Sequence, residues 1–333
     1  MSGIVSRLLV PPPAPSLADG RWSRYEILFW MIPLAGFFAF PGYHVFGSQI
    51  LIAALFAVSV DLILGYARIV SLGHAAYFGV GAYAAAHLAR YGWNEPVSGL
   101  LVAGIAAALF GFLTSFLVVR GQDVTRLMVT LGIGIMLYEA ANKAAGITGG
   151  IDGLGGYSMA KLMGSFPFDL DGHTAYVYSL AVLFLLFWMS RRIVNSPFGL
   201  SLRGIREGEK RMPAIGASVT RKLIAIYTVA SGIAGIAGGL LAQTTQFVSI
   251  ETLGINRSAE VVIMLIIGGT GRLYGGLLGA GVFMIMQNYL AGINPAYWQF
   301  WLGLMLVAII LFARGGLLGG IAALGQQIEQ RNR

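Results

Sequence analysis

The chain has 333 residues, of which 57% are apolar and 11% are charged, and its formal net charge is +8. Soluble domains carry about 25% charged residues, so this sequence lacks the charge that would cover a soluble protein of its size. Composition therefore excludes a soluble enzyme, a disordered chain and a nucleic-acid-binding domain. It predicts an all-α, polytopic helical membrane protein.

The residues that carry most enzyme chemistry are scarce. There is no cysteine, which excludes disulfides and thiolate metal sites. The histidines at positions 44, 74, 87 and 173 lie far apart in the sequence, so we expect no metal site. The chain has no nucleotide-binding motif and no paired acid–base constellation. We therefore expect no catalytic residue and no cofactor bound by this chain.

The N-terminal apolar run is short, is interrupted by Arg7 and ends at three prolines. It does not have the pattern of a signal peptide. Residues 1–25 are therefore predicted to be a cytoplasmic tail, followed by a membrane domain over 26–315 and a second cytoplasmic tail over 316–333. A crossing helix needs about 20 largely apolar residues. Ten segments are candidates: 27–45, 48–66, 69–89, 97–119, 124–142, 174–190, 222–246, 259–271, 273–292 and 297–314.

Two of these segments have features of broken or re-entrant helices. Segment 69–89 carries His74 and several glycines, and segment 259–271 is short and runs into Gly268-Gly269-Thr270-Gly271. Such helices are tolerated where protein surrounds them. Ten crossings and eight crossings with two re-entrant segments both remain open.

Positive charge predicts the orientation. If all ten segments cross and the N-terminus is cytoplasmic, every Lys and Arg is cytoplasmic except Arg90, Lys143, Lys161 and Arg257. Such an excess is what the positive-inside rule describes. Both termini are therefore predicted to be cytoplasmic.

Small residues recur at helical spacing. Gly232, Gly235, Gly238 and Gly239 mark one face of a predicted helix, and Gly275/Gly279 form a G-x-x-x-G pair. In lipid, such faces let helices approach closely. They predict a compact helical bundle.

The stretch 61–83 is the first candidate functional region. Ionisable groups inside a membrane are costly and usually face a cavity or the bundle interior. Ser71, His74 and Tyr77 are three residues apart and would share one helix face. They either line a passage or are structural, with Asp61 paired to Arg68. The candidate path residues are Asp61, Ser71, His74, Tyr77 and Tyr83.

The cytoplasmic loop 191–222 is the second candidate region, and it holds eight of the 22 Lys and Arg residues. Residues 196–216 are predicted to form a short amphipathic helix that stops or restarts at Pro213 and closes near Gly216. It is either a solvated loop that sets topology or a docking helix for a soluble partner. Its predicted apolar side consists of Leu200, Ile205, Met212 and Ile215.

The outer loop 143–173 contains a glycine-rich run over 148–156. It lacks the Gly-Lys-Ser/Thr ending of a phosphate-binding loop, so we interpret it as a turn that shapes the outer mouth. Composition leaves two main classes of function open: the membrane subunit of a pump that another protein drives, and a stand-alone facilitator or channel. An intramembrane enzyme is disfavoured because no acid–base pair is present.

The motifs resemble one family. Residues 61–86, with the run Ser-Leu-Gly-His-Ala-Ala-Tyr-Phe-Gly-Val-Gly-Ala-Tyr, resemble the signature of LivM-type permeases of branched-chain amino acid ABC importers. Segment 196–216 is similar to the family's coupling segment, and 148–154 and 268–280 also match. The resemblance covers roughly residues 45–320. Residues 122–126 depart from it, since relatives have a Tyr-containing apolar entry to the next helix.

The resemblance implies a multi-pass subunit of the bacterial inner membrane that contacts lipid. It implies a LivH-like second permease, two cytoplasmic ATPase subunits (LivG-like and LivF-like) that hold ATP and Mg, and a periplasmic binding protein. The implied substrates are branched-chain or other hydrophobic amino acids, with urea, short amides or other small carboxylates as alternatives. The expected ATPase-coupling residues are Arg203, Arg206, Glu207, Glu209, Lys210, Arg211 and Gly216.

Overall fold

A computed structural model describes residues 24–169, 171–295, 297–312, 315–317 and 319. The chain divides into two compact units, Met1–Phe40 and Pro41–Arg333. In the first unit the structure describes one helix, α2 (Arg24–Ala39), which contains Pro33. The predicted tails over 1–25 and 316–333 lie almost wholly outside the described residues.

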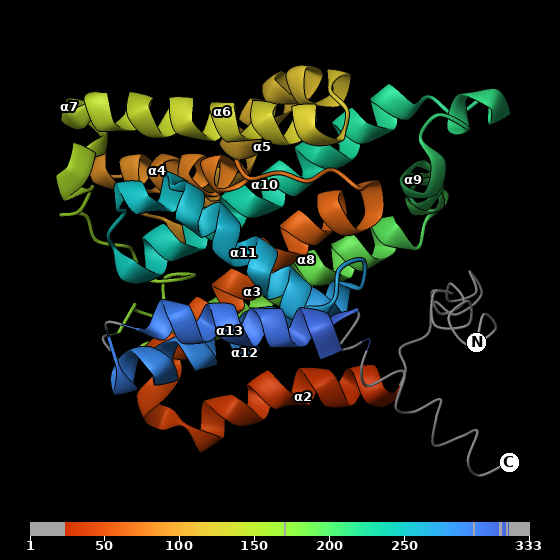
Figure 1. Cartoon of the computed structure of the whole chain (residues 1–333). Coiled ribbons are helices and arrows are strands. Elements are labelled where there is room, and N and C mark those ends of the chain that lie inside the picture. Colours follow the sequence, from red (N-terminus) through yellow and green to blue (C-terminus); the bar gives the residue numbers. More distant parts are fainter. Residues whose placement is uncertain (1–23, 170, 296, 313–314, 318, 320–333) are drawn as a thin grey trace, which may run out of the picture. The chain divides into compact units, whose positions relative to one another are not determined.

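The second unit is built from helices (Figure 1). The α-helices are α3 (His44–Ala67), α4 (Ala75–Arg90), α5 (Pro96–Arg120), α6 (Asp123–Lys143), α7 (Ala145–Thr148), α8 (His173–Val194), α9 (Pro197–Gly208), α10 (Val219–Thr245), α11 (Ile255–Gly268), α12 (Leu273–Ile293) and α13 (Trp298–Phe312). Short 3-10 helices include η3 (Met212–Ile215) and η4 (Ile250–Leu253). The prediction of an all-α fold is confirmed.

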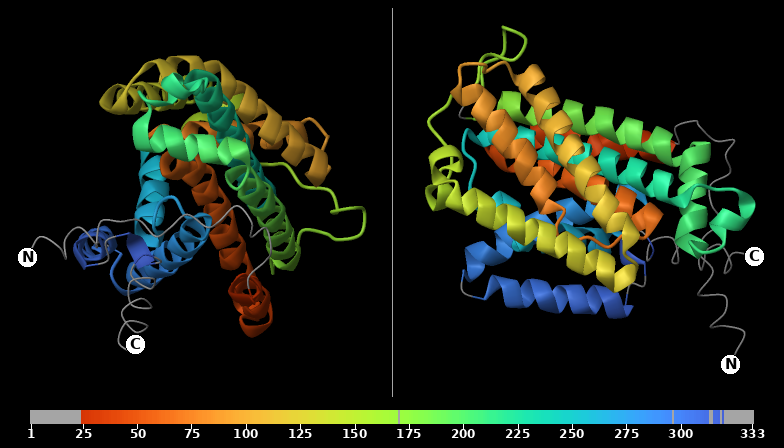
Figure 2. Two further views of the ribbon diagram at one scale, coloured as in Figure 1. Left: turned by 90° about the vertical axis from the view of Figure 1, so that its right-hand side faces the viewer. Right: turned by 90° about the horizontal axis from the view of Figure 1, so that it is seen from above.

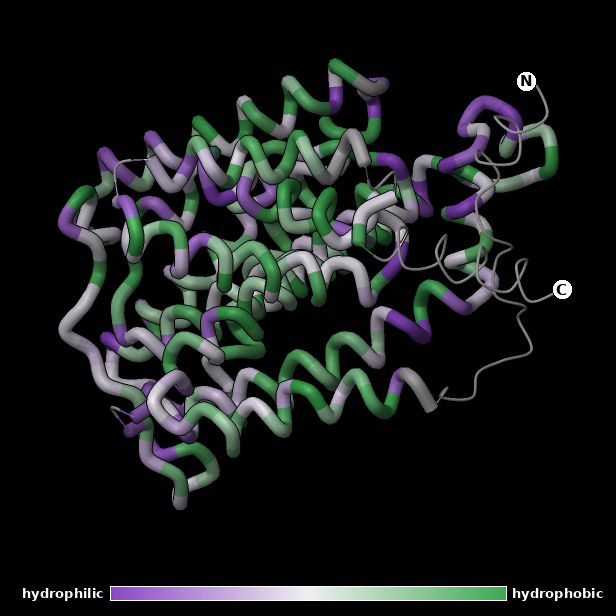
Figure 3. The backbone as a smooth tube through the Cα atoms, turned by 60° about the horizontal axis from the view of Figure 1, so that its bottom comes forward, coloured by the Kyte–Doolittle hydropathy of each residue, from purple (hydrophilic) through white to green (hydrophobic). Residues whose placement is uncertain are grey.

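Each of the ten predicted segments overlaps mainly with one α-helix, α2 included. Six described helices are long and apolar enough to cross a membrane: Pro41–Ala67, Pro96–Arg120, Val124–Lys143, His173–Val194, Val219–Thr245 and Leu273–Ile293. The other four, α2, α4, α11 and α13, have 14 to 16 residues. A helix of 16 residues is about 24 Å long, which is less than the hydrocarbon thickness. Figure 3 shows that hydrophobic residues follow much of the helical tube.

Two helices form the core of the second unit. α3 packs against α8, α10, α11 and α12, and α10 packs against α3, α4 and α5. Within the most apolar 18-residue stretch of each helix, 89% of the residues of α3 and 72% of those of α10 are buried. α5, α6, α8 and α12 are at most 44% buried in theirs, so they present broad apolar faces to lipid or to other subunits. Figure 2 shows neighbouring helices around α3 and α10.

The glycine faces predicted from the sequence lie at the closest helix contacts. Gly235 of α10 packs against the backbone of α5 and against Gly81 of α4. Gly238 packs against the carbonyl of Phe78. Gly275 packs against the turn that ends α11. The prediction of close packing through these glycines is confirmed.

The helix predicted to start at residue 69 starts at Ala75. Arg68 has a left-handed φ of 56° and ends α3, and the following residues run to His74 without helical structure. Gly73 passes against the carbonyl of Thr130 in α6. The Ala75 N–H donates to Ser258 Oγ at 2.9 Å, so a side chain of α11 satisfies the first turn of α4.

The tight glycine contacts predict that alanine destabilises the protein at a packed glycine but not at an open one. Gly238→Ala places a methyl group against the Phe78 carbonyl, and overpacking of this kind costs about 1–3 kcal/mol. We expect a lower melting temperature for the detergent-solubilised protein, followed by fluorescence-detected size exclusion. Gly132→Ala is the matched control, because no atom would lie within 4 Å of its new methyl group. Equal melting temperatures for the two variants would contradict the packing interpretation.

Candidate functional site

The predicted path residues do not share one helix face. Ser71 and His74 precede α4, whereas Tyr77 lies in its first turn, so the expectation of a common face was wrong. The cause is the non-helical segment after Arg68. Whether any of the five contacts substrate stays a prediction.

Tyr77 nevertheless lies at the centre of a buried polar network. Its hydroxyl is 2.8 Å from Thr114 Oγ1 of α5 and 2.9 Å from the hydroxyl of Tyr227 in α10. Ser71 lies beside Tyr227, although its own hydroxyl lacks a hydrogen bond with good geometry among the described residues. The network ties α4, α5 and α10 together inside the bundle.

His74 is enclosed by the same helices. Its side chain is fully buried, and its Nε2 atom is 3.3 Å from Ser59 Oγ of α3. The imidazole stacks on Phe56 at a centroid distance of 5.9 Å and meets Tyr77 edge-on at 5.3 Å. These contacts support the structural alternative for His74, in which it bonds to a neighbouring helix.

Asp61 does not pair with Arg68, which was the structural alternative for its role. Its Oδ1 atom accepts a hydrogen bond from the Gly271 N–H at 2.7 Å. The cation whose charge acts on it is Arg206 of α9, whereas Arg68 is exposed. The expected Asp61–Arg68 pair was therefore wrong, because the chain turns at Arg68 and leads its side chain away.

The segment 196–216 folds as a short helix followed by a turn, and it lies where α8 ends and α10 begins (Figure 1). Ser196 caps α9 and Pro197 occupies its first turn. The helix stops at Gly208, five residues before Pro213, where the sequence predicted the stop, and Pro213 lies in the first turn of η3. Gly216 has a φ of 80°, which fits the predicted turn.

The buried side of α9 is only partly the predicted one. Ile205 and Met212 are buried as expected, but Leu200 is 39% exposed and Ile215 is 75% exposed. Leu202, three residues before Ile205, is fully buried instead. The difference arises because the helix ends at Gly208, so Ile215 belongs to η3 and no longer follows the α9 period.

Three of the expected coupling residues contact this chain itself. Arg203 lies over the ring of Tyr66 at 5.6 Å, and Arg206 donates to the carbonyl of Gly65. Glu209 accepts two hydrogen bonds from Arg126, at 2.6 and 3.1 Å.

The other charged members of the predicted set point to the surface. Glu207, Lys210 and Arg211 are exposed, and their side chains form no ion pair with a described residue. The coupling role of all seven residues stays a prediction. The structure separates the residues that contact other helices of this chain (Arg203, Arg206 and Glu209) from exposed residues that do not, although Arg206 is also exposed.

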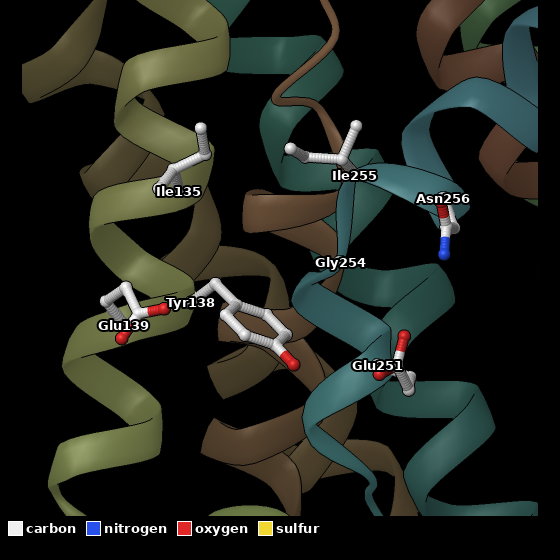
Figure 4. Close-up of a pocket in the computed structure, with 7 residues that line it drawn as sticks. All are labelled: Ile135, Tyr138, Glu139, Glu251, Gly254, Ile255 and Asn256. Carbon is white, nitrogen blue, oxygen red and sulfur yellow. The ribbon is translucent and has the colours of Figure 1, made fainter.

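A cavity of about 350 Å³ opens between α6, η4 and the start of α11 (Figure 4). Its polar side chains include Tyr138, Glu139, Glu251 and Asn256. In Figure 4 the Tyr138 ring extends from α6 toward η4, with Glu139 on one side and Glu251 on the other. Neither carboxylate forms an ion pair with a described residue.

Of the five predicted path residues, Tyr83 lies nearest to this cavity. It packs in the same apolar cluster as Leu253, and Tyr138 packs against that cluster. Its buried hydroxyl has no hydrogen-bond partner among the described residues. The sequence did offer a signal for the cavity that we missed, because Glu139 is an acidic residue inside a predicted span.

Three ligand-type side chains also meet at the start of α8, although the sequence led us to expect no metal site. Asp169, Asp171 and His173 bring their donor atoms within 4.8 Å of one another. However, Asp169 already accepts from His173 Nδ1 at 2.9 Å and from the Thr174 N–H at 3.2 Å. These exposed groups are engaged in the first turn of α8, which accounts for their proximity without an ion.

The sequence matches the family described as the branched-chain amino acid transport system / permease component over residues 46–310. This match covers most of the chain and all helices that form the network, the cavity and α9. The chain belongs to this permease family.

Individual relatives are distant. The permease is 25% identical to the high-affinity branched-chain amino acid transport permease LivM of Salmonella typhimurium, over 81% of this chain and 68% of the relative. It is also 25% identical to LivM of Escherichia coli, over 80% and 68%. The galactose/methyl galactoside import permease MglC of Haemophilus influenzae is 27% identical, over 62% of each chain. No solved structure matches the chain.

Membership settles the coarse function. The permease is the transmembrane component of an ABC-type importer and a multi-pass membrane protein. It is not an enzyme, and its family implies ATPase and binding-protein partners. The names of its relatives span amino acids, sugars and autoinducer 2, so they leave the substrate unassigned.

The enclosure of His74 predicts a packing defect when its ring is removed. Truncation of a fully buried ring to alanine costs about 3–5 kcal/mol, so His74→Ala is expected to lower the melting temperature and the yield of assembled complex. The complex that does assemble is expected to transport at the parent rate. His87→Ala, which alters a half-buried position at the end of α4, is the control. Slower uptake by His74→Ala at equal assembly would instead support contact with the path.

Proposed function

We propose that this chain is a LivM-like permease subunit of an ATP-driven, binding-protein-dependent importer in the bacterial inner membrane. It would form half of the path for branched-chain or other hydrophobic amino acids. A LivH-like permease would supply the other half, two LivG-like and LivF-like ATPases would drive the cycle, and a periplasmic protein would deliver the solute.

The observation that carries this proposal is the family match over residues 46–310 together with the LivM relatives. These relatives align with about four fifths of the chain. A third protein named LivM, from Methanocaldococcus jannaschii, aligns with 73% of it. The galactose and fructose permeases align with 62% and 66%. The autoinducer 2 permease LsrC of Enterobacter sp. aligns with 79%, so alignment length does not separate the substrate classes. The family description and the three LivM names are what support amino acids.

The surface around α9 supports an ATPase partner. It presents exposed charges at Glu207, Lys210 and Arg211 beside the exposed side chain of Ile215. An apolar anchor surrounded by charges is typical of a docking surface for a soluble protein. The sequence has no nucleotide-binding motif of its own, so the energy must come from a partner.

The cavity between α6, η4 and α11 supports a substrate with an ammonium group. Glu139 and Glu251 are both available there, and a carboxylate stabilises an ammonium group through a charge-assisted hydrogen bond. Tyr138 offers an aromatic face, which attracts a cation as well. An amino acid could use these groups on its way through, whereas a neutral sugar would use them only as uncharged acceptors.

The importer and the stand-alone facilitator predict different results in liposomes. We expect the purified chain alone to give no solute flux, and the complex with the second permease, the ATPases and a loaded binding protein to take up leucine when ATP is supplied. Flux through the isolated chain, independent of ATP, would favour the facilitator and overturn the proposal.

Charge removal in the cavity separates the substrate classes. Glu139→Gln and Glu251→Gln keep hydrogen-bonding groups but remove the charge, and a charged hydrogen bond contributes about 1.5–3 kcal/mol. We therefore expect about a tenfold lower apparent affinity for leucine uptake in the reconstituted complex. Asp152→Asn, an exposed carboxylate of the outer loop, is the control. Unchanged leucine uptake would remove these carboxylates from the path, and urea uptake that is insensitive to both variants would favour the amide alternative.

A further inference from the structure

Two charged residues of the coupling segment, three positions apart, reach two separate parts of the membrane domain. Glu209 pairs with Arg126 of α6, which we name the α6 arm. Arg206 contacts Gly65 at the end of α3 and the turn between α11 and α12 at Gly271, which we name the turn arm. Both residues were expected to face the ATPase, but both point into this chain.

The α6 arm is a two-point contact. The Arg126 Nη2 atom donates to Glu209 Oε1 at 2.6 Å, and Nη1 donates to Oε2 at 3.1 Å. The Arg126 side chain is 4% exposed, and its Nε atom has no partner among the described residues. A guanidinium that is held in this way by one carboxylate follows the position of that carboxylate. The α6 arm therefore joins residue 209 to the first turn of α6.

The turn arm is an interlocked set of backbone and side-chain groups. Arg206 donates to the Gly65 carbonyl, and its guanidinium also packs against Gly271. The Gly271 N–H donates in turn to Asp61 of α3. Gly271 has a φ of 78°, a conformation that disfavours any residue with a side chain. The turn arm therefore joins residue 206 to the turn that ends α11.

The two arms lead to the two walls of the cavity. α6 begins at the α6 arm and lines the cavity farther along with Ile135, Tyr138 and Glu139. α11 ends next to the turn arm and lines the cavity at its start with Ile255 and Asn256. Each helix thus connects the coupling segment at one end with a cavity wall at the other.

We propose that Glu209–Arg126 and Arg206–Gly65/Gly271 transmit a shift of α9 to α6 and α11 and thereby change the distance between the two cavity walls. Arg126, Arg206 and Glu209 are positioning residues in this scheme, because they act through the helices and not on the solute. The inference rests on the proposed function, in which ATPase subunits move α9.

The absence of cysteine makes a direct test convenient. Spin labels are attached to Met136→Cys on α6 and Asn256→Cys on α11 in the fully assembled complex. Their distance is measured without nucleotide and with the ATPases trapped in the ATP-bound state. We expect the distance to shift between the two states in the parent and most of this shift to be lost in Glu209→Gln. In Glu209→Gln, uptake per ATP hydrolysed should fall about fivefold or more. A coupling between two sites typically changes an equilibrium by a factor of this size.

Three further variants separate transmission from a general defect. The swapped pair Arg126→Glu/Glu209→Arg is expected to restore the distance shift. Glu260→Gln removes a carboxylate from an Arg–Glu pair confined to α11 and is expected to keep the shift. Glu209→Asp keeps the charge but shortens the reach, and it replaces Glu209→Gln if that variant does not assemble.

The outcomes distinguish this inference from the function on which it rests. A full distance shift in Glu209→Gln or Glu209→Asp, with normal uptake per ATP, overturns the transmission role and leaves the importer assignment intact. Failure of the swapped pair to restore the shift in an assembled complex also overturns it. A parent complex that shows no ATP-driven uptake contradicts the proposed function itself.

Discussion

Inside a bilayer a polar group has no water to bind, so the chain must supply its partners. This constraint organises the interior of the permease. Tyr77, Thr114 and Tyr227 satisfy one another between three helices, and the carboxylate of Asp61 receives the N–H of a turn that lies 210 residues away in the sequence. These buried polar groups therefore lie where separate segments of the chain meet.

The constraint also explains the non-helical stretch 68–74. A break in a membrane helix exposes backbone groups, and it is tolerated where surrounding protein satisfies them. Here the Ile69 N–H bonds back to Ile63, and Ser258 receives the N–H of Ala75. The break brings His74 and Tyr77 into the middle of the bundle, where aromatic rings of α3 and α10 enclose them.

Features that depend on local pattern were predictable from the sequence. Long apolar runs located the helices, glycine spacing located the close contacts, and Gly216 marked the turn that follows η3. Features that depend on distant segments were not predictable. Nothing near Asp61 indicates that its partner is Gly271. A charge in the 191–222 segment likewise looks the same in the sequence whether it is exposed, like Glu207, or pairs with a buried arginine, like Glu209. The cavity was only half indicated, because Glu139 inside a predicted span was a local signal but its proximity to Glu251 was not visible in the sequence.

The glycine contacts of α10 have a mechanical consequence. Where backbones of α4, α5 and α10 interlock at Gly235 and Gly238, one helix cannot slide along another without first separating from it. These helices must move as one rigid body. α6 and α12 are each only 28% buried in their spans, and α6 is joined to α9 by a side-chain pair. The helices that interlock at these glycines are thus the stiff part of the chain, whereas α6 has few contacts within it that would resist a shift.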